Sequence, residues 1–222
     1  MAKIRIQAEY SAQARSARPN PLVSRAIAEL SALRGDKATR LRIADQGCGM
    51  LRNTRLLAAI SRELFLVDTD AQLNSVHTDG ELRFTIADAA SEMSSSRLQV
   101  HAVTAAAFSK SRLRLDAIFC VAVMDVVPKK VRRSIIQSAA SNLGSGSYFV
   151  LIVPRNDSSI LKRCNANNRY QDGFIFQRPG RTTFYRNFLT CKALLTECST
   201  VGLSVIRDIS NYRQVGILFV RT

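Results

Sequence analysis

The residues with the clearest chemical potential form a glycine turn behind a short apolar run. Ile43–Asn53 reads IADQGCGMLRN, so Gly47 and Gly49 follow the run and precede a helix-forming segment. A strand that passes through Gly-x-Gly into a helix places bare backbone N–H groups and a helix N-terminus beside a ligand. Glycine suits these positions because a Cβ atom would block both the tight turn and the close approach. The pattern predicts a ligand site against the backbone.

Two common ligand classes fit this turn poorly, whereas a ribose-binding carboxylate follows at a suitable distance. A P-loop needs GxxxxGK[ST], and no Lys-Ser or Lys-Thr pair follows the glycines. A dehydrogenase fingerprint needs a third glycine at the position of Arg52, so dinucleotide binding is weakly supported. Asp68 ends the apolar run Leu64–Val67, close to the roughly 20-residue spacing at which an acidic residue binds ribose hydroxyls. A carboxylate can accept from both hydroxyls at once.

Apolar runs alternate with segments of helical period along the chain, which is the pattern of βαβ units and a mostly parallel sheet. The strands that we expect are Leu41–Ala44, Leu64–Val67, Leu98–Val103, Ala117–Val123, Tyr148–Val153, Leu203–Arg207 and Val215–Val220. The expected helices are Pro21–Leu33 with Asn20 as N-cap, Arg52–Ser61, Ala71–Val76 with Asp70 as cap, a helix from Pro128 to an αL cap at Gly144, and Phe188–Val201. Thr78–Ser96 has no clear pattern, and its SEMSSS stretch predicts a loop.

These motifs resemble those of a known enzyme family. Asp45-Gln46-Gly47-Cys48-Gly49 resembles motif I of the class I S-adenosylmethionine-dependent methyltransferases, which is an apolar strand, Asp/Glu-x-Gly-x-Gly and a helix. Gly47–Asn53 is similar to the GCGxxRN form of many members, with Leu51 where a third glycine is common. LFLVDTDAQL resembles the family's second strand and its acidic end, and Asp116–Pro154 resembles its block of fourth strand, helix and fifth strand.

The resemblance covers Leu41–Val220 and implies an α/β fold. We expect a doubly wound, seven-stranded, mostly parallel sheet with helices on both faces and an antiparallel last strand. Residues 1–222 would form a single methyltransferase-like domain, with an N-terminal helical extension over residues 1–40 and a lid or substrate-binding insertion over residues 155–187.

The cofactor that the resemblance implies is S-adenosyl-L-methionine. The residues that it implies for cofactor binding are Asp45, Gly47, Cys48, Gly49, Arg52, Asn53, Asp68, Thr69 and Thr104. Asp45 is expected near the amino group of the methionine part. Thr104 stands where many members carry an aspartate that contacts the adenine, so a hydrogen bond would replace a charged contact there.

The acceptor of the methyl group is less constrained. Adenine-N6 and cytosine-N4 DNA methyltransferases need [DNS]PP[YFW] after the fourth strand, where this chain has VAVMDVVP, and cytosine-C5 enzymes need a Pro-Cys pair that the chain lacks. Transfer to an O, N or S acceptor remains, which requires alignment and at most a base. No catalytic residue is assigned; Asp125 and Tyr185 are candidates to face the transfer site. His101 is expected to be a strand residue and His77 a helix end.

Charge makes nucleic acid a candidate partner. The net charge is +15, and Arg155–Lys192 alone carries eight basic and two acidic residues. Its aromatic residues, among them Phe174 and Phe176, could stack on bases while arginines hold phosphates, or could pack as the lid of a small-molecule site. A small-molecule methyltransferase and a non-catalytic nucleic-acid-binding module on a methyltransferase scaffold are therefore the alternative functions. The basic run Lys129–Arg133 predicts a solvated helix face, with a phosphate-binding patch as the alternative.

The remaining composition predicts a cytoplasmic chain without a membrane or metal site. The longest apolar runs, Ala117–Met124 and Tyr148–Val153, are too short to span a bilayer, and the N-terminus has no signal-like apolar region. Five cysteines form no CxxC pair, so we expect reduced thiols rather than a disulfide frame or a zinc site.

Overall fold

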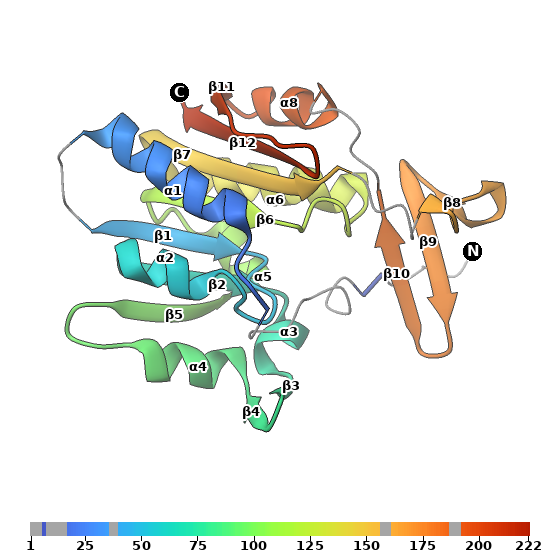
Figure 1. The fold of residues 1–222 in the computed structure, drawn as a ribbon, viewed down its shortest axis with the longest axis horizontal. Coiled ribbons are helices and arrows are strands. Elements are labelled where there is room, and N and C mark those ends of the chain that lie inside the picture. The colour runs from blue at the N-terminus through green and yellow to red at the C-terminus, as the bar shows by residue number, and fades with distance from the viewer. Residues whose placement is uncertain (1–5, 8–16, 36–39, 156–160, 187–191) are drawn as a thin grey trace.

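The structure is a computed structural model that describes residues 6–7, 17–35, 40–155, 161–186 and 192–222. Its body is one seven-stranded sheet with helices on both faces (Figure 1). The strands of this sheet are β1 (Leu41–Gln46), β2 (Ser61–Asp68), β5 (Gln99–Thr104), β6 (Leu115–Val121), β7 (Leu143–Pro154), β11 (Leu203–Asp208) and β12 (Gln214–Arg221). The helices are α1 (Pro21–Arg34), α2 (Thr54–Ile60), α3 (Asp70–Asn74), α4 (Ile86–Met93), α5 (Ala105–Lys110), α6 (Lys129–Asn142) and α8 (Lys192–Ser199).

The strand order is β11-β12-β7-β6-β1-β2-β5. Every pair from β5 to β7 is parallel, whereas β12 runs antiparallel to both β7 and β11. The predicted doubly wound, mostly parallel sheet with an antiparallel last strand is therefore confirmed. The seven expected strands all form, although several extend beyond the predicted bounds by one to five residues.

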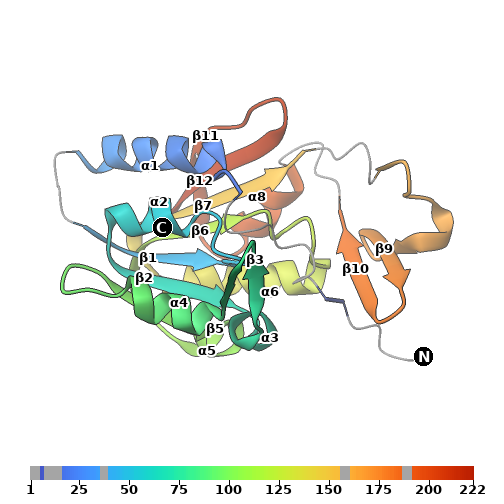
Figure 2. The same cartoon turned by 60° about the horizontal axis from the view of Figure 1, so that its bottom comes forward.

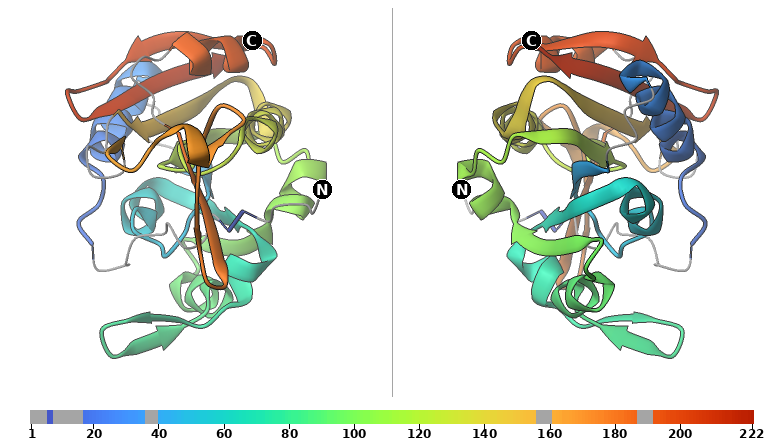
Figure 3. Two further views of the ribbon diagram at one scale, coloured as in Figure 1. Left: turned by 90° about the vertical axis from the view of Figure 1, so that its right-hand side faces the viewer. Right: turned by 90° about the vertical axis from the view of Figure 1, so that its left-hand side faces the viewer.

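The central strands of the sheet are buried on both faces, which explains why they are apolar almost throughout. Along β2, Leu64 and Leu66 pack into one hydrophobic core with α1, α2 and α4, while Phe65 and Val67 pack into a second core with α5, α6 and α8. The other central strands alternate in the same way. Figure 3 shows the two helical layers on either side of the strands. Because the helices cover both faces of the central strands, a ligand can reach these strands at their ends.

Several helix boundaries follow the predicted signals, and others do not. The Asn20 side chain caps α1 by accepting a hydrogen bond from the Leu22 N–H at 3.0 Å, as predicted. The cap of α3 is Thr69, not Asp70, because the Thr69 hydroxyl accepts from the Gln72 N–H. The αL cap predicted at Gly144 is wrong, because Leu143 is already buried and paired with β6 as the first residue of β7.

The unassigned stretch Thr78–Ser96 contains regular structure. A small hairpin, β3 (His77–Asp79) and β4 (Leu82–Phe84), is followed by α4. A capping box between Thr85 and Asp88 starts this helix, and the helix continues to Met93, so the loop predicted for SEMSSS is wrong in its first half. His77 lies in a strand rather than at a helix end. The short helix α5 was not expected either.

The lid predicted over residues 155–187 contains a separate antiparallel sheet with the order β10-β9-β8. Its elements are a 3₁₀ turn (Ala166–Asn168), β8 (Arg169–Tyr170), β9 (Gly173–Arg178) and β10 (Arg181–Tyr185). Figures 1 and 2 show that β9 and β10 stand beside the body, on the side to which the arrowheads of β1, β2 and β7 point. From the N-terminal segment, Gln7 reaches the outer strand: its N–H donates to the Thr182 carbonyl at 2.8 Å. The predicted start of the last helix, Phe188–Cys191, lies outside the described residues.

Within the described residues, no helix is both long and apolar enough to cross a membrane.

Candidate active site

The strand order places a ligand site at one point of the sheet. β1 lies between β6 and β2, and the chain leaves β1 toward β2 and β5 and later returns to the other side through β6. In open α/β sheets, ligands bind outside the carboxyl ends of the strands at such a reversal. We call this side of the sheet the carboxyl edge. The predicted glycine turn follows β1 there, Asp68 ends β2, and the loop with Asp125 follows β6.

The glycine turn is folded back onto the end of β2. The N–H groups of Gly47 and Cys48 both donate to the Val67 carbonyl, at 2.7 and 3.2 Å. Gly47 and Gly49 have φ angles of 81° and 53°, a region that residues with a side chain rarely adopt. A Cβ atom on Gly47 would also lie 2.3 Å from Cγ2 of Val123, in the loop after β6. Glycine is thus required by the backbone path and by a neighbouring loop.

The Asp68 carboxylate is partly exposed and organises the turn. Its Oδ2 accepts from the Gly49 N–H at 2.9 Å, and its Oδ1 accepts from the Thr69 N–H at 2.8 Å. The Cys48 thiol lies 4.0 Å from Oδ2 and is a further, weak donor. The arrangement therefore fixes a partly exposed carboxylate, a group that accepts hydrogen bonds from hydroxyls, beside the turn.

Asp45 and Cys48 lie below the surface of the turn. The Asp45 side chain is 2% exposed and accepts from the Thr54 hydroxyl at 3.2 Å. Burial raises the pKa of Asp45 to about 7, the Thr54 hydrogen bond lowers it and the neighbouring Asp68 charge raises it. Burial also raises the pKa of the Cys48 thiol, so this side chain is neutral. A cationic ammonium group near the turn would be favoured by the negative charge of Asp68 and would favour the ionised form of Asp45.

The other predicted cofactor residues organise backbone around the turn. The Arg52 guanidinium donates through Nε to the Arg18 carbonyl at 2.7 Å, and Asn53 Oδ1 accepts from the Asn20 N–H at 2.9 Å. Arg52 and Asn53 thereby hold the segment before α1 beside the turn. Thr104, which pairs with Asp68 in the β2–β5 register, caps α5 through its hydroxyl, as Thr69 caps α3. Cofactor contacts of Arg52, Asn53, Thr69 and Thr104 stay a prediction.

Asp125 is a second buried carboxyl group at the carboxyl edge. Its side chain is 5% exposed, and its Oδ1 has no hydrogen-bond partner among the described residues. Burial raises the pKa of Asp125 to about 7. Its backbone carbonyl accepts from the Arg186 N–H at 2.7 Å, so the end of β10 is joined to this loop. A buried carboxyl oxygen without a hydrogen-bond partner is costly and often marks a functional site.

Solved structures of low sequence identity share this fold. Magnesium protoporphyrin IX methyltransferase from Synechocystis PCC 6803, crystallised with bound S-adenosylhomocysteine, is 18% identical, with a TM-score of 0.60 over 90% of this chain and 82% of that chain. An S-adenosylmethionine-dependent methyltransferase from Methanosarcina mazei is 14% identical, with a TM-score of 0.62 over 92% and 99%. The fold is that of the class I S-adenosylmethionine-dependent methyltransferases. No family model matches the chain, and no curated protein matches it.

A buried charge cluster joins the lid to the body of this methyltransferase fold. Arg132 on α6 is fully buried and pairs with Glu197 on α8 through two hydrogen bonds, from Nε at 3.2 Å and from Nη2 at 3.0 Å. Arg132 also pairs with Asp172, in the turn between β8 and β9, and Asp172 accepts from Arg186. We call these four residues the lid clasp. Three elements far apart in sequence are thus tied together by charge.

The lid clasp was missed by sequence reasoning. Arg132 belongs to the run Lys129–Arg133, and the prediction of a solvated face is wrong for this residue. A signal was available: Arg132, Ile136, Ala139 and Ala140 are spaced as one face of a helix, and all are buried. Nothing in the sequence indicated that Glu197 and Asp172 would be its partners.

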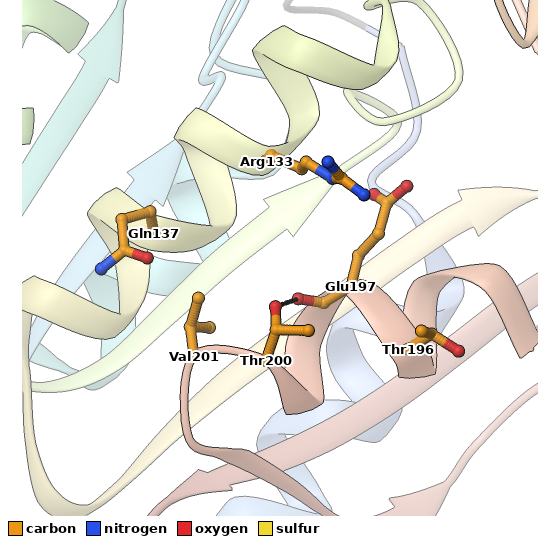
Figure 4. Close-up of a pocket in the computed structure, with 6 residues that line it drawn as sticks. All are labelled: Arg133, Gln137, Thr196, Glu197, Thr200 and Val201. Carbon is orange, nitrogen blue, oxygen red and sulfur yellow. Dashed lines mark hydrogen bonds between the residues drawn. The ribbon is translucent and has the colours of Figure 1, made fainter.

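The structure also contains a cavity of about 380 Å³ between α6 and α8 (Figure 4). It is lined by Arg133, Gln137, Thr196, Glu197, Thr200 and Val201. The Thr200 hydroxyl donates to the Glu197 carbonyl at 2.8 Å, and the Glu197 carboxylate belongs to the lid clasp. None of the predicted cofactor residues lines this cavity. Among the described residues, no cluster of three or more His, Cys, Asp and Glu side chains could hold a metal ion.

Proposed function

We propose that this chain is an S-adenosylmethionine-dependent methyltransferase that acts on an O, N or S acceptor. The observation that carries the proposal is the meeting of the glycine turn and Asp68 at the reversal of strand order. Backbone bent by positive φ angles and a fixed, partly exposed carboxylate are brought together there. This set of groups suits a ligand with a ribose, an amino group and a flexible polar chain.

The residues present fit the cofactor in chemical terms. Asp68 would accept hydrogen bonds from the two ribose hydroxyls, and the turn at Gly47–Gly49 would receive the methionine part. Asp45 would stay below the turn and contribute negative charge toward the amino group. When bound, S-adenosylmethionine supplies a methyl group already activated by a sulfonium, so the protein must supply mainly alignment.

Asp125 is our candidate for the group that takes a proton from the acceptor. It lies in the loop after β6, next to the glycine turn through Val123, and its Oδ1 has no partner. A carboxyl group with a pKa of about 7 is matched to proton transfer near neutral pH. Tyr185 is a weaker candidate because its side chain is buried between the lid and the body, at 4% exposure.

Two acceptor classes differ in what supports them. The Synechocystis neighbour is by its name an enzyme of a small molecule, magnesium protoporphyrin IX. The net charge of +15 and the basic lid of this chain favour a nucleic acid. The alternative to an enzyme is a non-catalytic nucleic-acid-binding module on a methyltransferase scaffold. We also propose a cytoplasmic location, on the cysteine pattern given above.

The proposal is tested by calorimetric titration of the purified chain with S-adenosylhomocysteine, with NAD as the control ligand. We expect micromolar binding of the former and none of the latter. Asp68→Ala should weaken binding by more than about tenfold, or roughly 1.4 kcal/mol, because the ribose loses its acceptors. Asp70→Ala is the matched control, since Asp70 is an exposed acid two residues away.

Two results would count against the proposal. An unchanged affinity in folded Asp68→Ala would remove Asp68 from the site. The absence of S-adenosylhomocysteine binding by the folded wild type would remove the enzyme assignment and leave the non-catalytic alternative.

A further inference from the structure

Two arginine–aromatic pairs lie on the surface outside the proposed cofactor site. The guanidinium carbon of Arg163 lies 4.7 Å from the centre of the Phe176 ring, in the lid. The guanidinium carbon of Arg213 lies 5.0 Å from the centre of the Tyr212 ring, in the loop between β11 and β12. Tyr212 is 79% exposed, so its ring offers a face to a partner. Arginine and aromatic planes of this kind are surfaces on which nucleic-acid bases stack.

Both pairs belong to the same side of the molecule. β12 runs antiparallel to β7, so its first residue, Gln214, lies opposite Pro154 at the carboxyl edge. The loop before it is held there because the Arg155 N–H donates to the Arg213 carbonyl at 2.8 Å. Arg155 is the first residue of the segment predicted as the lid. Figure 1 shows the β11–β12 loop on the side of the body that faces β9 and β10.

The lid offers an excess of positive charge to a partner. Lys162, Arg163, Arg169 and Arg178 are exposed, and none of the ion pairs between described residues includes them. Asp172 is the one acidic residue in the described part of the lid, over residues 161–186, and it is engaged in the lid clasp. Among the described residues of the lid, the positive charge of these four side chains is therefore not paired with an acidic side chain.

The lid hairpin also places two like charges together. Arg178 on β9 is the cross-strand partner of Arg181 on β10. This register brings two guanidinium groups to neighbouring positions at the end of the hairpin. A phosphate group suits such a pair because guanidinium groups donate to phosphate oxygens in a forked geometry.

We propose that the lid and the β11–β12 loop form a binding surface for single-stranded nucleic acid. Phosphates lie on the lid arginines, and bases stack on the Arg163–Phe176 and Arg213–Tyr212 pairs. A single strand is favoured over a duplex because only unpaired bases expose their faces. The surface flanks the loop of Asp125, to which the Arg186 N–H joins the lid. The inference rests on the proposed function where it names a single-stranded nucleic acid as the methyl acceptor.

Fluorescence anisotropy with a labelled oligonucleotide of about 12 nucleotides, within the site sizes usual for single strands, tests the surface. The same mixed sequence is used as RNA, as DNA and as a duplex. We expect single strands to bind more tightly than the duplex, and the tighter of RNA and DNA identifies the natural source. With four phosphate contacts, the logarithm of the affinity should fall with the logarithm of salt with a slope of about −3.

Charge-matched variants separate this surface from the net charge of the chain. Arg169→Glu/Arg178→Glu reverses two charges on the lid, and Arg97→Glu/Arg112→Glu reverses two exposed charges before β5 and β6, at the opposite edge of the sheet. The lid variant should bind at least about tenfold more weakly and with a flatter salt slope. Equal losses in the two variants, or tighter binding of the duplex than of either single strand, would overturn the proposal.

The aromatic contribution has its own control. Tyr212→Ala should weaken single-strand binding by roughly tenfold, within the range measured for base stacking, whereas Tyr212→Phe keeps the ring and should bind as the wild type does. A Tyr212→Ala affinity equal to that of the wild type would overturn stacking at this loop. These assays need no cofactor. Loss of S-adenosylhomocysteine binding with intact strand binding would therefore reject the methyltransferase activity and retain the surface.

Discussion

The glycine turn and the lid serve the same carboxyl edge but are held by different forces. The turn is fixed by backbone hydrogen bonds to the end of β2 and by Asp68, which bonds a residue only 19 positions before it. The lid is fixed by charged side chains, in which Arg132 reaches Asp172 and Glu197, 40 and 65 positions away. A local motif thus builds the proposed cofactor side, and long-range ion pairs position the proposed acceptor side.

This difference predicts separate failure modes. Damage to the lid clasp should loosen the lid and leave cofactor binding nearly intact, because the turn is fixed by its hydrogen bonds to the end of β2 and to Asp68. Damage to the turn should remove cofactor binding while the lid stays attached. Each prediction below tests one side of this separation.

The largest effect is expected at Arg132. Arg132→Leu leaves the buried Glu197 carboxylate without its cation, and such a loss costs about 3–5 kcal/mol of unfolding free energy. Chemical denaturation measures the loss, and amide exchange should rise mainly in residues 169–186. S-adenosylhomocysteine affinity of the folded fraction should stay unchanged.

Two further variants make the Arg132 result specific. Arg133→Leu removes the neighbouring exposed arginine of α6 and should change stability little. Arg132→Leu/Glu197→Leu removes both charges and should be more stable than the single variant. A double variant less stable than Arg132→Leu would show that burial of unpaired charge is not the cause.

A smaller effect is expected at Gly47. Gly47→Ala adds a Cβ atom 2.3 Å from Cγ2 of Val123 and forces a positive φ on alanine, for a combined cost of about 2–4 kcal/mol. Cofactor affinity should fall with it because the turn must shift, which calorimetry measures. Amide exchange in the lid should not change.

Gly80 provides the matched control for strain alone. It has a φ of +64° with nothing within 4 Å of an added Cβ, so Gly80→Ala should cost only about 1 kcal/mol. Gly47→Ala/Val123→Ala should recover part of the loss by removing the clash. If this double variant binds no better than Gly47→Ala, contact with Val123 is not what requires the glycine.

The difference between local contacts in the turn and long-range contacts in the lid also decides how much of the structure could be predicted from the sequence. Glycines, an acidic strand end and buried strands are local signals, so the sheet and the position of Asp68 follow from short stretches of sequence. The unpaired Oδ1 of Asp125 and the partners of Arg132 depend on how α6, α8 and the lid pack together. The helical spacing of Arg132 with Ile136 indicates that Arg132 is buried, but no local pattern encodes its partners. The hydrogen bonds of Arg52 and Asn53 could not be predicted for a similar reason, since their partners are backbone atoms of the segment before α1. Contact of either residue with a cofactor stays a prediction.

The last comparison concerns the two buried carboxyl groups, Asp45 beside the glycine turn and Asp125 in the loop after β6. Burial raises the pKa of Asp45 and of Asp125 to about 7, from a usual value of 3.8. Because the folded state binds these protons more tightly than the unfolded state, the free energy of unfolding should fall as pH rises from about 4 to about 7. The slope is at most about 1.4 kcal/mol per pH unit for each group.

Denaturation of the wild type, Asp45→Asn and Asp125→Asn between pH 4 and 8 measures these slopes. Each variant should lose about half of the pH dependence, because one titrating group is left. Methyl transfer should separate them. If Asp125 accepts the acceptor's proton, the wild-type rate rises with pH to a plateau above about 7, and Asp45→Asn keeps that profile while Asp125→Asn loses it. A profile retained in Asp125→Asn would assign the proton transfer to another group. Asp125 would then be a buried acid in the loop that accepts the Arg186 N–H.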